Sequence, residues 1–261
     1  MIRYNNLKIL NILVEKKEVV IMFDYTDKRI IYIILAVLVV LSIANMSAGE
    51  WLNILLTLPA VIIAITFHEF AHAFVADKLG DTTPRAQGRL TLNPLKHLDP
   101  VGFVLLMFAH VGWGKPVEIN PNNFTSNKSK SACEALISLA GPVMNFIIAI
   151  ISTIIYYALY TFAPVNATTG ILIMLTYLTS IINIGIGVFN LIPLPPLDGE
   201  KIFRHILPYK AQEWLDRNAY ILNMIFLGLW FFGLLGYVVS PIINVIYNAI
   251  FKLVGFVFKL F

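Results

Sequence analysis

The stretch Ala64-Ile65-Thr66-Phe67-His68-Glu69-Phe70-Ala71-His72-Ala73 places two histidines and a glutamate inside an apolar run. Because His68 and His72 are four residues apart, both side chains leave the same face of a helix, one turn apart. That spacing lets two imidazoles bind one metal ion, with Glu69 beside them to take a proton from water. The same pattern occurs by chance in soluble helices. Here the span 51–76 carries no other ionisable group, and such groups are costly in a membrane-length helix, so we predict that they are functional.

The composition indicates an integral membrane protein. The chain has 261 residues, of which 58% are hydrophobic and 13% are charged, whereas a soluble domain carries about 25% charged residues. Its mean hydropathy is +0.78. The single cysteine, Cys133, excludes an internal disulfide and a cysteine-rich zinc site. We interpret the net charge of +4 as loop charge that sets orientation, since no surface with interleaved basic and aromatic residues suggests nucleic acid.

We predict an all-α polytopic membrane protein with about six transmembrane helices. The apolar segments are, in chain order, 30–43 (extended by 44–48), 51–78, 132–162, 170–191, 219–239 and 241–258. About 20 residues are needed to cross the hydrocarbon core, at a rise of ~1.5 Å per residue. Gly80 ends the second span, and Gly236 and Pro241 separate the last two.

Between the second and third spans the sequence predicts a small membrane-associated β-hairpin or re-entrant element. Residues 101–112 are apolar but too short to span, which suits a re-entrant or buried segment. The following residues, 112–120, combine glycine and proline with an alternation of Val117 and Ile119. This pattern predicts short extended strands in a hairpin-like loop.

We divide the chain into three parts. Residues 1–29 form an N-terminal cytoplasmic or interfacial segment, residues 30–217 the catalytic transmembrane core, and residues 218–261 a C-terminal transmembrane helical hairpin. The first segment mixes lysines with aliphatic residues and lacks a small-residue cleavage site, so we predict no signal peptide. An interfacial helix, a short strand pair and a start of the protein at Met22 are alternatives that the sequence leaves open.

The distribution of lysine and arginine predicts the orientation in the cell membrane. The loops 44–50, 163–169 and 236–240 carry neither residue, whereas the other polar segments and both terminal regions carry several. By the positive-inside rule the basic segments are cytoplasmic. Both termini, and the metal motif near the inner end of its helix, are therefore expected on the cytoplasmic side.

The fourth predicted span breaks at Asn190-Leu191-Ile192-Pro193-Leu194-Pro195-Pro196-Leu197-Asp198-Gly199. Its closely spaced prolines cannot stay in a regular helix. Non-helical backbone at membrane depth survives only where it is buried or lines a wet cavity. Asp198 is expected near the cytoplasmic side, at a depth comparable with that of His68 and His72. Its carboxylate is available as a third metal ligand, which leaves one position of a tetrahedral zinc site for water.

Three motifs taken together resemble the site-2 protease family of intramembrane zinc metalloproteases. They are residues 67–73, the stretch Gly141-Pro142-Val143-Met144-Asn145, and the broken segment 190–199. The resemblance covers about residues 60–210, and residues 88–94 and 114–117 are similar to the compact members without a PDZ domain. It implies a metalloendopeptidase that hydrolyses a peptide bond in or near a transmembrane segment of a membrane protein.

The resemblance also implies roles for single residues. His68, His72 and Asp198 would bind one zinc ion per chain, and Glu69 would be the general base. Asn190 matches an asparagine of the family that holds the substrate carbonyl or its oxyanion.

Substrate-binding residues are implied in the same way. The candidates are Asn145, Gly114, Lys115, Pro116 and Val117, the last four in a strand element that receives the substrate. The family usually has a second glycine after the Asp-Gly pair. This sequence has Glu200 instead, and we expect its side chain to point into the loop.

Two other functions could use the same residues. In a membrane metal-ion transporter, His68, Glu69, His72 and Asp198 would form a transit site. Transporters often contain internal repeats, but the sequence shows one broken helix and no repeat. A catalytically silent scaffold would have lost Glu69 or a ligand, and neither is lost. We therefore favour the protease, with a transmembrane protein substrate and the lipid bilayer as partners and no nucleic acid. Association with itself or with a regulatory membrane protein is left open.

Overall fold

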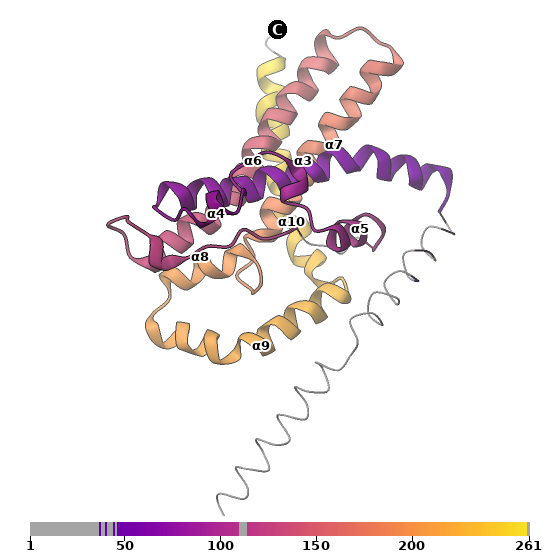
Figure 1. The fold of residues 1–261 in the computed structure, drawn as a ribbon. Helices are drawn as coiled ribbons and strands as arrows, with labels where there is room; N and C mark the ends of the chain where they lie inside the picture. Colours follow the sequence, from indigo (N-terminus) through magenta and orange to yellow (C-terminus); the bar gives the residue numbers. More distant parts are fainter. Residues whose placement is uncertain (1–36, 38–39, 41–43, 45, 110–113, 260–261) are drawn as a thin grey trace, which may run out of the picture.

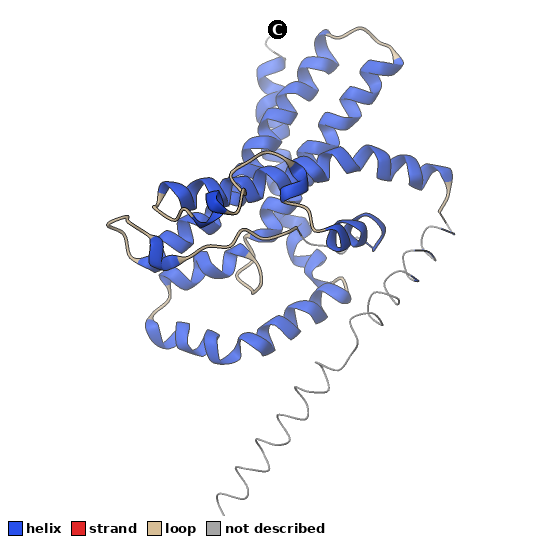
Figure 2. Cartoon of the chain, viewed as in Figure 1, coloured by secondary structure: helices blue, strands red, loops and turns tan. Residues whose placement is uncertain are grey.

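The computed structural model describes residues 46–109 and 114–259, together with the single residues 37, 40 and 44. The regular elements of these ranges are all helical, as Figure 2 shows, which confirms the predicted all-α class. The elements are α3 (Ala48–Lys78), α4 (Thr83–Ala86), η1 (Pro94–Lys96), α5 (Pro100–Ala109), η2 (Pro121–Asn123), α6 (Lys130–Phe162), α7 (Ala167–Asn190), α8 (Asp198–Ile206), α9 (Tyr209–Phe231) and α10 (Leu234–Phe258).

Four of the described helices, α3, α6, α7 and α10, are long and apolar enough to cross a membrane. They confirm a multi-pass membrane protein and match the predicted spans 51–78, 132–162 and 170–191 to within a few residues. The first predicted span, 30–43, lies almost entirely outside the described residues. The expected total of six spans is therefore not confirmed.

The boundary predicted between the last two spans is wrong. The structure has no break at Gly236 or Pro241, since both lie inside α10. The chain instead turns at Gly233, whose φ is +69°. This left-handed conformation is open to glycine because it has no Cβ. The predicted span 219–239 is thus divided between α9 and α10.

The predicted hairpin at 112–120 is also not confirmed. Residues 114–120 form no strand in the described structure, and an isolated antiparallel bridge joins Gly114 to Leu98. Residues 110–113 lie outside the described ranges. The apolar segment before them forms α5, a helix of 10 residues that is too short to span a bilayer, as predicted.

Side-chain caps explain where the long helices begin. Ser47 and Glu50 form a capping box at the start of α3, in which Glu50 N donates to Ser47 Oγ at 3.3 Å and Ser47 N donates to Glu50 Oε2 at 2.7 Å. Ser129 caps α6, and Asn166 caps α7, each by accepting a backbone N–H of the first turn. Helix α6 accordingly begins at Lys130, two residues before the predicted span 132–162.

Helix α3 crosses the hairpin formed by α6 and α7 and packs against both (Figure 1). Helix α10 packs along α6 and α7, and α8 packs against α6. One apolar core joins α6, α7 and α10 through Ala149, Ile184, Val188 and Val239. A second core joins α3 to α5 through Val61, Ile65 and Met107. Together these contacts hold the middle of α3 against the helix pair.

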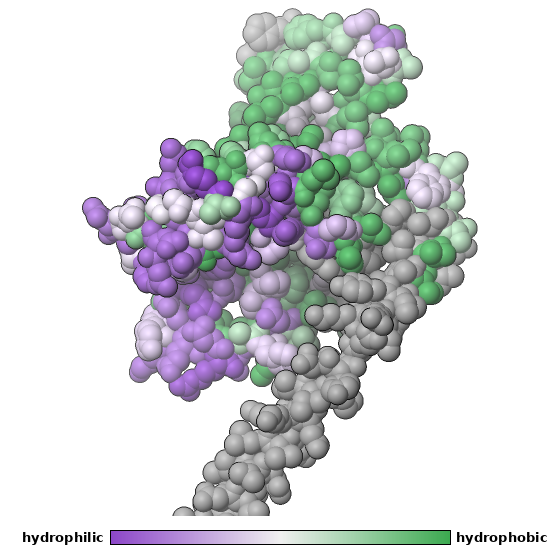
Figure 3. Space-filling model, in the orientation of Figure 1, coloured by the Kyte–Doolittle hydropathy of each residue, from purple (hydrophilic) through white to green (hydrophobic). Residues whose placement is uncertain are grey.

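Hydrophobic and hydrophilic surfaces are segregated. In Figure 3 the hydrophobic surface covers the α6–α7 hairpin, and the hydrophilic surface covers the region of α4 and α8. The four apolar helices also keep many large side chains exposed, such as Ile151, Ile171 and Val245. An exposed apolar surface of this extent is typical of contact with lipid.

Asp81, which is fully buried just after α3, fastens a distant loop to the end of that helix. Its Oδ1 accepts hydrogen bonds from Thr83 N at 3.0 Å and Asn123 Nδ2 at 3.0 Å, and its Oδ2 accepts from Asn120 N at 2.7 Å. Burial alone would raise the pKa of Asp81, but the hydrogen bonds from Thr83, Asn120 and Asn123 outweigh it and hold that pKa below its usual range.

Replacing this carboxylate tests its contribution to stability. In Asp81→Asn the amide NH2 would replace one acceptor oxygen and would face the N–H donors of Thr83, Asn120 or Asn123. We therefore expect a loss of about 1–3 kcal/mol in the free energy of unfolding. A lower thermal midpoint in detergent measures this loss. Because the folded-state pKa lies below the unfolded value of about 3.9, the carboxylate's contribution is complete above that pH and is lost as the pH falls through the folded-state pKa. The gap between the wild type and the variant should therefore shrink at acid pH.

A suitable control is Asp216→Asn, which removes the exposed partner of Arg204. Exposed ion pairs contribute about 0–1 kcal/mol, so this variant should change the midpoint little. A gap for Asp81→Asn that stays constant from neutral to strongly acid pH would contradict the assignment.

Candidate metal centre

Three side chains from two distant parts of the chain converge. His68 Nε2 and His72 Nε2 lie 3.0 Å apart. Asp198 Oδ2 lies 3.1 Å from His68 Nε2 and 3.2 Å from His72 Nε2. Both histidines are buried and Asp198 is half-buried. The proximity expected from the sequence is therefore present in the structure.

Local structure explains how the aspartate reaches the histidines. The prolines end α7 at Asn190, the chain turns through residues 191–197, and Asp198 becomes the first residue of α8. Gly199 follows it, at a point where a Cβ would collide with the carbonyl oxygens of Leu191 and Ile192. Glycine thus lets α8 begin directly against the end of α7, which places the carboxylate beside α3.

The His72 ring is fixed by a backbone carbonyl. Its Nδ1 lies 2.6 Å from Ile137 O of α6. A carbonyl oxygen can only accept, so Nδ1 carries the proton and donates it. In the neutral ring Nε2 then holds a lone pair, which faces His68 and Asp198.

The His68 ring is fixed by Asn145, which is fully buried on α6. Asn145 Nδ2 donates to Ala64 O at 3.1 Å and to Asn183 Oδ1 at 2.9 Å, so its Oδ1 faces His68 Nδ1 at 2.6 Å. The carbonyl of Ala64 can only accept, and this requirement assigns the two ends of the amide. His68 Nδ1 therefore donates, and both imidazoles present Nε2 lone pairs to the same point.

This donor set fits a zinc ion. Zinc in hydrolytic sites takes three protein ligands at about 2.0–2.2 Å, and a tetrahedral arrangement separates neighbouring ligand atoms by about 3.3 Å. The observed separations are 3.0–3.2 Å. Two imidazole nitrogens and one carboxylate oxygen are also the ligand types that zinc accepts.

Gly141 leaves room beside the three donor atoms. A Cβ at this position of α6 would lie 2.5 Å from His72 Nε2 and 2.6 Å from His68 Nε2. Real Cβ atoms do not approach nitrogen so closely, so α6 can pass the histidines at this height only with glycine. A side chain here would fill the space toward which both lone pairs point.

Glu69 follows His68 in α3, and its side chain contacts the segment that follows α5. Its Oε2 accepts a hydrogen bond from Val117 N at 3.1 Å. Arg89 Nη2 holds the preceding residues by donating to Lys115 O at 3.1 Å and Pro116 O at 2.7 Å. Lys115 N donates to the His97 carbonyl at 2.8 Å. The segment 114–117 is therefore fastened over the carboxylate of Glu69.

Other predicted site residues have different surroundings. Asn190 Nδ2 donates to Ile186 O at 3.0 Å, one turn back in α7, and none of its described hydrogen bonds reaches the histidines. Asn145 lies behind His68, with no exposed surface. Glu200 pairs with Arg204 at 2.7 Å within α8, and it is not part of the three-residue group.

Sequence reasoning missed two contributors to this site. Asn183 contacts Asn145, and Ile137 supplies the carbonyl that fixes His72. An asparagine inside an apolar span is a detectable signal for Asn183, because such amides usually bond across helices. No sequence signal identifies the Ile137 carbonyl, since every residue has one.

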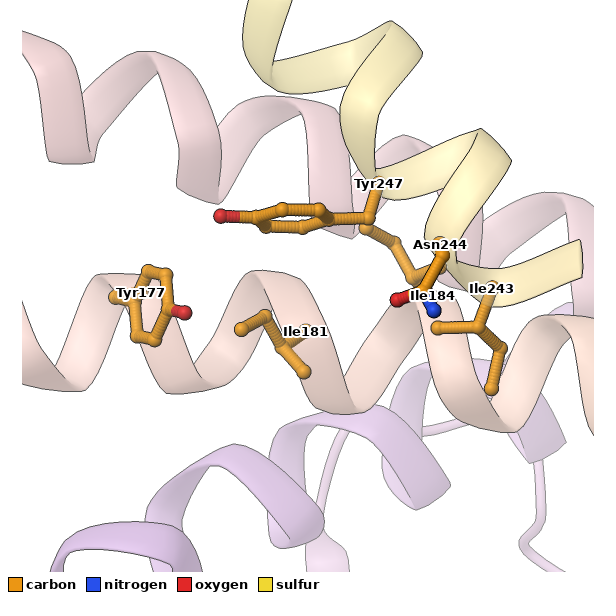
Figure 4. Close-up of a pocket in the computed structure, with 6 residues that line it drawn as sticks. All are labelled: Tyr177, Ile181, Ile184, Ile243, Asn244 and Tyr247. Carbon is orange, nitrogen blue, oxygen red and sulfur yellow. The ribbon is translucent and has the colours of Figure 1, made fainter. Parts of the chain in front are cut away.

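A cavity of about 190 Å³ lies elsewhere, between α7 and α10 (Figure 4). Its lining is mainly apolar, with polar atoms from Tyr177, Asn244 and Tyr247. His68, His72 and Asp198 are not among the residues that line this cavity. The three-residue group is therefore the stronger candidate for chemistry.

Comparison with known proteins agrees with the geometry. Residues 56–168 and 160–233 match the family described as Peptidase family M50. The chain belongs to peptidase family M50. The predicted activity, an intramembrane zinc metalloprotease that acts on membrane proteins in the bilayer, is confirmed by this membership, whereas the transporter alternative receives no support.

Several proteins named as zinc metalloproteases are similar to this chain over 56–76% of its length. YwhC of Bacillus subtilis, named as a zinc metalloprotease, is 35% identical over 208 residues, which are 76% of this chain and 90% of YwhC. Rip2 of Mycolicibacterium smegmatis, named likewise, is 30% identical over 56% of this chain and 54% of Rip2. The zinc metalloprotease MJ0392 of Methanocaldococcus jannaschii is 30% identical over 67% of this chain and 40% of its own length. No solved structure gives a significant match.

The space at Gly141 gives a direct test of whether the three-residue group holds zinc. Gly141→Ala would place a methyl group against both Nε2 atoms, so we expect the bound zinc to fall from about one ion per chain to a small fraction. Metal analysis of purified protein measures this. Gly185→Ala is the control, since a Cβ there meets its nearest atom, Ile243 Cδ1, at 4.0 Å. Full zinc content in Gly141→Ala would show that the ion is held elsewhere.

Proposed function

We propose that His68, His72 and Asp198 hold one zinc ion per chain and that Glu69 is the general base of peptide-bond hydrolysis. The observation that carries this proposal is the convergence of two Nε2 atoms and one carboxylate oxygen within 3.0–3.2 Å of one another. In the sequence these residues are up to 130 positions apart. Burying three such groups together without a cation would be costly.

The chemistry follows from the positions of these side chains. When bound, zinc polarises a carbonyl oxygen and makes water acidic near neutral pH. Glu69 follows His68 directly in the chain, and its Oε2 is already paired with Val117 N–H. The carboxylate is therefore oriented, and its other oxygen can accept the proton that water loses on attack. It can then deliver that proton to the leaving amine.

We assign Asn190 to the oxyanion. The position of Asn190 supports this assignment, because it lies in the last turn of α7, just before the bend that leads to Asp198. Its amide donates to Ile186 O, so the side chain must rotate to reach a substrate. A donor directed at the developing oxyanion contributes about 3–4 kcal/mol where it has been measured.

The segment 114–120 is proposed to receive the substrate, with Gly114, Lys115, Pro116 and Val117 nearest the site. A helical substrate hides its carbonyl groups in hydrogen bonds, so it must unwind before cleavage. An extended chain can pair with a free backbone edge. In the described contacts, the backbone groups of Glu118 and Ile119 have no partner, which gives such an edge next to Val117.

The topology is proposed from the charge distribution. Lysine and arginine are absent from the loop 163–169 and from the turn at Gly233 between α9 and α10, and they are frequent in 78–96 and 201–217. This distribution supports cytoplasmic termini and an active site toward the cytoplasm. Six spans require a helix near 30–43 and a crossing by α9. The terminal hairpin 218–261 would then consist of α10 and the part of α9 that follows residue 217.

The role of Glu69 is tested by Glu69→Gln. Because glutamine keeps the size and a hydrogen-bond acceptor for Val117 N–H but cannot take a proton, we expect cleavage to fall at least 100-fold while zinc content is unchanged. A panel of single-span membrane proteins, incubated with each variant in vesicles, measures the cleavage. Retained cleavage would remove Glu69 from the mechanism, and lost zinc would make it a ligand instead.

The proposed docking edge is tested at Ile119. Ile119→Pro removes a backbone N–H, so we expect cleavage to fall about tenfold, the effect of roughly one lost hydrogen bond, with zinc content unchanged. Ile119→Ala keeps the backbone and is the matched control. Equal effects of the two substitutions on cleavage would show that the side chain matters and the edge does not.

A further inference from the structure

We propose that Asn183 of α7 is a positioning residue for the zinc ligand His68, acting through Asn145. The inference rests on the proposed metal-binding role of His68 and extends it to a helix that supplies no ligand. Neither asparagine touches the reacting atoms. Their function would be to hold the imidazole at the angle and in the tautomer that zinc needs.

The contacts form a continuous chain across three helices. His68 Nδ1 of α3 donates to Asn145 Oδ1 of α6 at 2.6 Å, and Asn145 Nδ2 donates to Asn183 Oδ1 of α7 at 2.9 Å. Asn183 Nδ2 in turn donates to Thr179 O at 2.8 Å, one turn back in its own helix. Each group in the chain uses the donor or acceptor that its neighbour requires.

The two partners of Asn145 have separate tasks. Ala64 O, at 3.1 Å from Nδ2, fixes which end of the amide faces His68, because a carbonyl accepts only. Asn183 Oδ1, on α7, accepts a hydrogen bond from the same Nδ2 and so fixes the position of the Asn145 amide group. With either contact missing, the Asn145 side chain can tilt, and the His68 ring can tilt with it.

Burial makes this arrangement specific. Asn145 and Asn183 both have 0% exposed surface, so water cannot replace a lost partner without a cavity. Gly187, one turn beyond Asn183, lets α7 approach closely, since a Cβ there would lie 3.1 Å from the Phe146 ring and 3.4 Å from Asn145 Cβ. Helix α7 is thus placed so that the amide of Asn183 reaches its partner.

A purely structural role for Asn183, as a polar contact between helices, is the alternative to be tested. The same pair of helices offers a matched control for it. Ser180 is also fully buried on α7, and its Oγ donates to Ala149 O at 3.1 Å and pairs with Thr153 Oγ1 at 2.7 Å on α6. No described contact links Ser180 to His68. Ser180→Ala therefore removes a buried α6–α7 contact without touching the chain that leads to the ligand.

The experiment measures zinc affinity of the full-length protein in detergent by competition with a chromophoric chelator. Outer-shell partners of metal ligands typically contribute 10–100-fold to affinity. We expect Asn145→Ala to weaken binding about 100-fold and Asn183→Ala about tenfold, with Ser180→Ala unchanged. Asn183→Asp, whose buried carboxyl group in its protonated form keeps an acceptor oxygen for Asn145 Nδ2 and an O–H donor for Thr179 O, should restore affinity to within about threefold of the wild type.

A second readout is the visible spectrum of the protein loaded with Co²⁺ in place of zinc. The bands should change in Asn183→Ala, because the ligand ring is reoriented, and stay the same in Ser180→Ala. If Asn183→Ala does not fold, Asn183→Ser replaces it, since it leaves a buried polar group but no amide. Equal zinc affinity and equal Co²⁺ spectra for the Asn183 and Ser180 variants, with similar losses of thermal stability, would overturn the proposal.

His68→Ala separates this inference from the proposed function. Wild-type protein that binds one zinc ion, lost in His68→Ala, together with an unaffected Asn183→Ala, overturns the positioning role alone. Wild-type protein whose zinc binding is unaffected by His68→Ala overturns the metal assignment and the positioning role with it. Loss of zinc in His68→Ala combined with selective weakening in Asn183→Ala supports both.

Discussion

A histidine buried among apolar helices needs a partner for each ring nitrogen, and this requirement organises the centre of the molecule. The Nδ1 atoms of His68 and His72 face acceptors on α6, at 2.6 Å in both cases. Their Nε2 atoms consequently face each other and the Asp198 carboxylate. Helix α6 therefore has two effects on the histidines of α3. It supplies the acceptors for both Nδ1 atoms, and its Gly141 leaves space beside both Nε2 atoms.

The parts of the site that depend on local sequence could be predicted. A four-residue spacing puts His68 and His72 on one face of any helix, and a run of prolines ends any helix near Asp198. The chain order of the helices and three of the apolar spans followed in the same way. Asn145 was identified by resemblance to a family, but its place behind His68 was not, because that depends on how α3 crosses α6.

Features set by packing between distant helices could not be predicted. Asn183 matters because Gly187 brings α7 close to α6, and the sequence alone does not show which helices meet at that point. The break between α9 and α10 lies at Gly233, although Gly236 and Pro241 are equally good candidates by residue type. The expected hairpin at 112–120 was inferred from alternation. The described residues there instead bond to the side chains of Arg89, Glu69 and Asp81, which compete with pairing between strands.

The crowding of electron-rich atoms has a consequence for folding. Two nitrogen lone pairs and a carboxylate oxygen, held 3.0–3.2 Å apart, repel one another unless a positive charge lies among them. If zinc binds there as proposed, the contact between α3 and α8, which carry these atoms, depends on the occupancy of the site. The free energy of cation binding would then stabilise the contact between these helices. Folding of this region and metal binding are therefore expected to be one cooperative transition, so that removal of the metal also destabilises the fold.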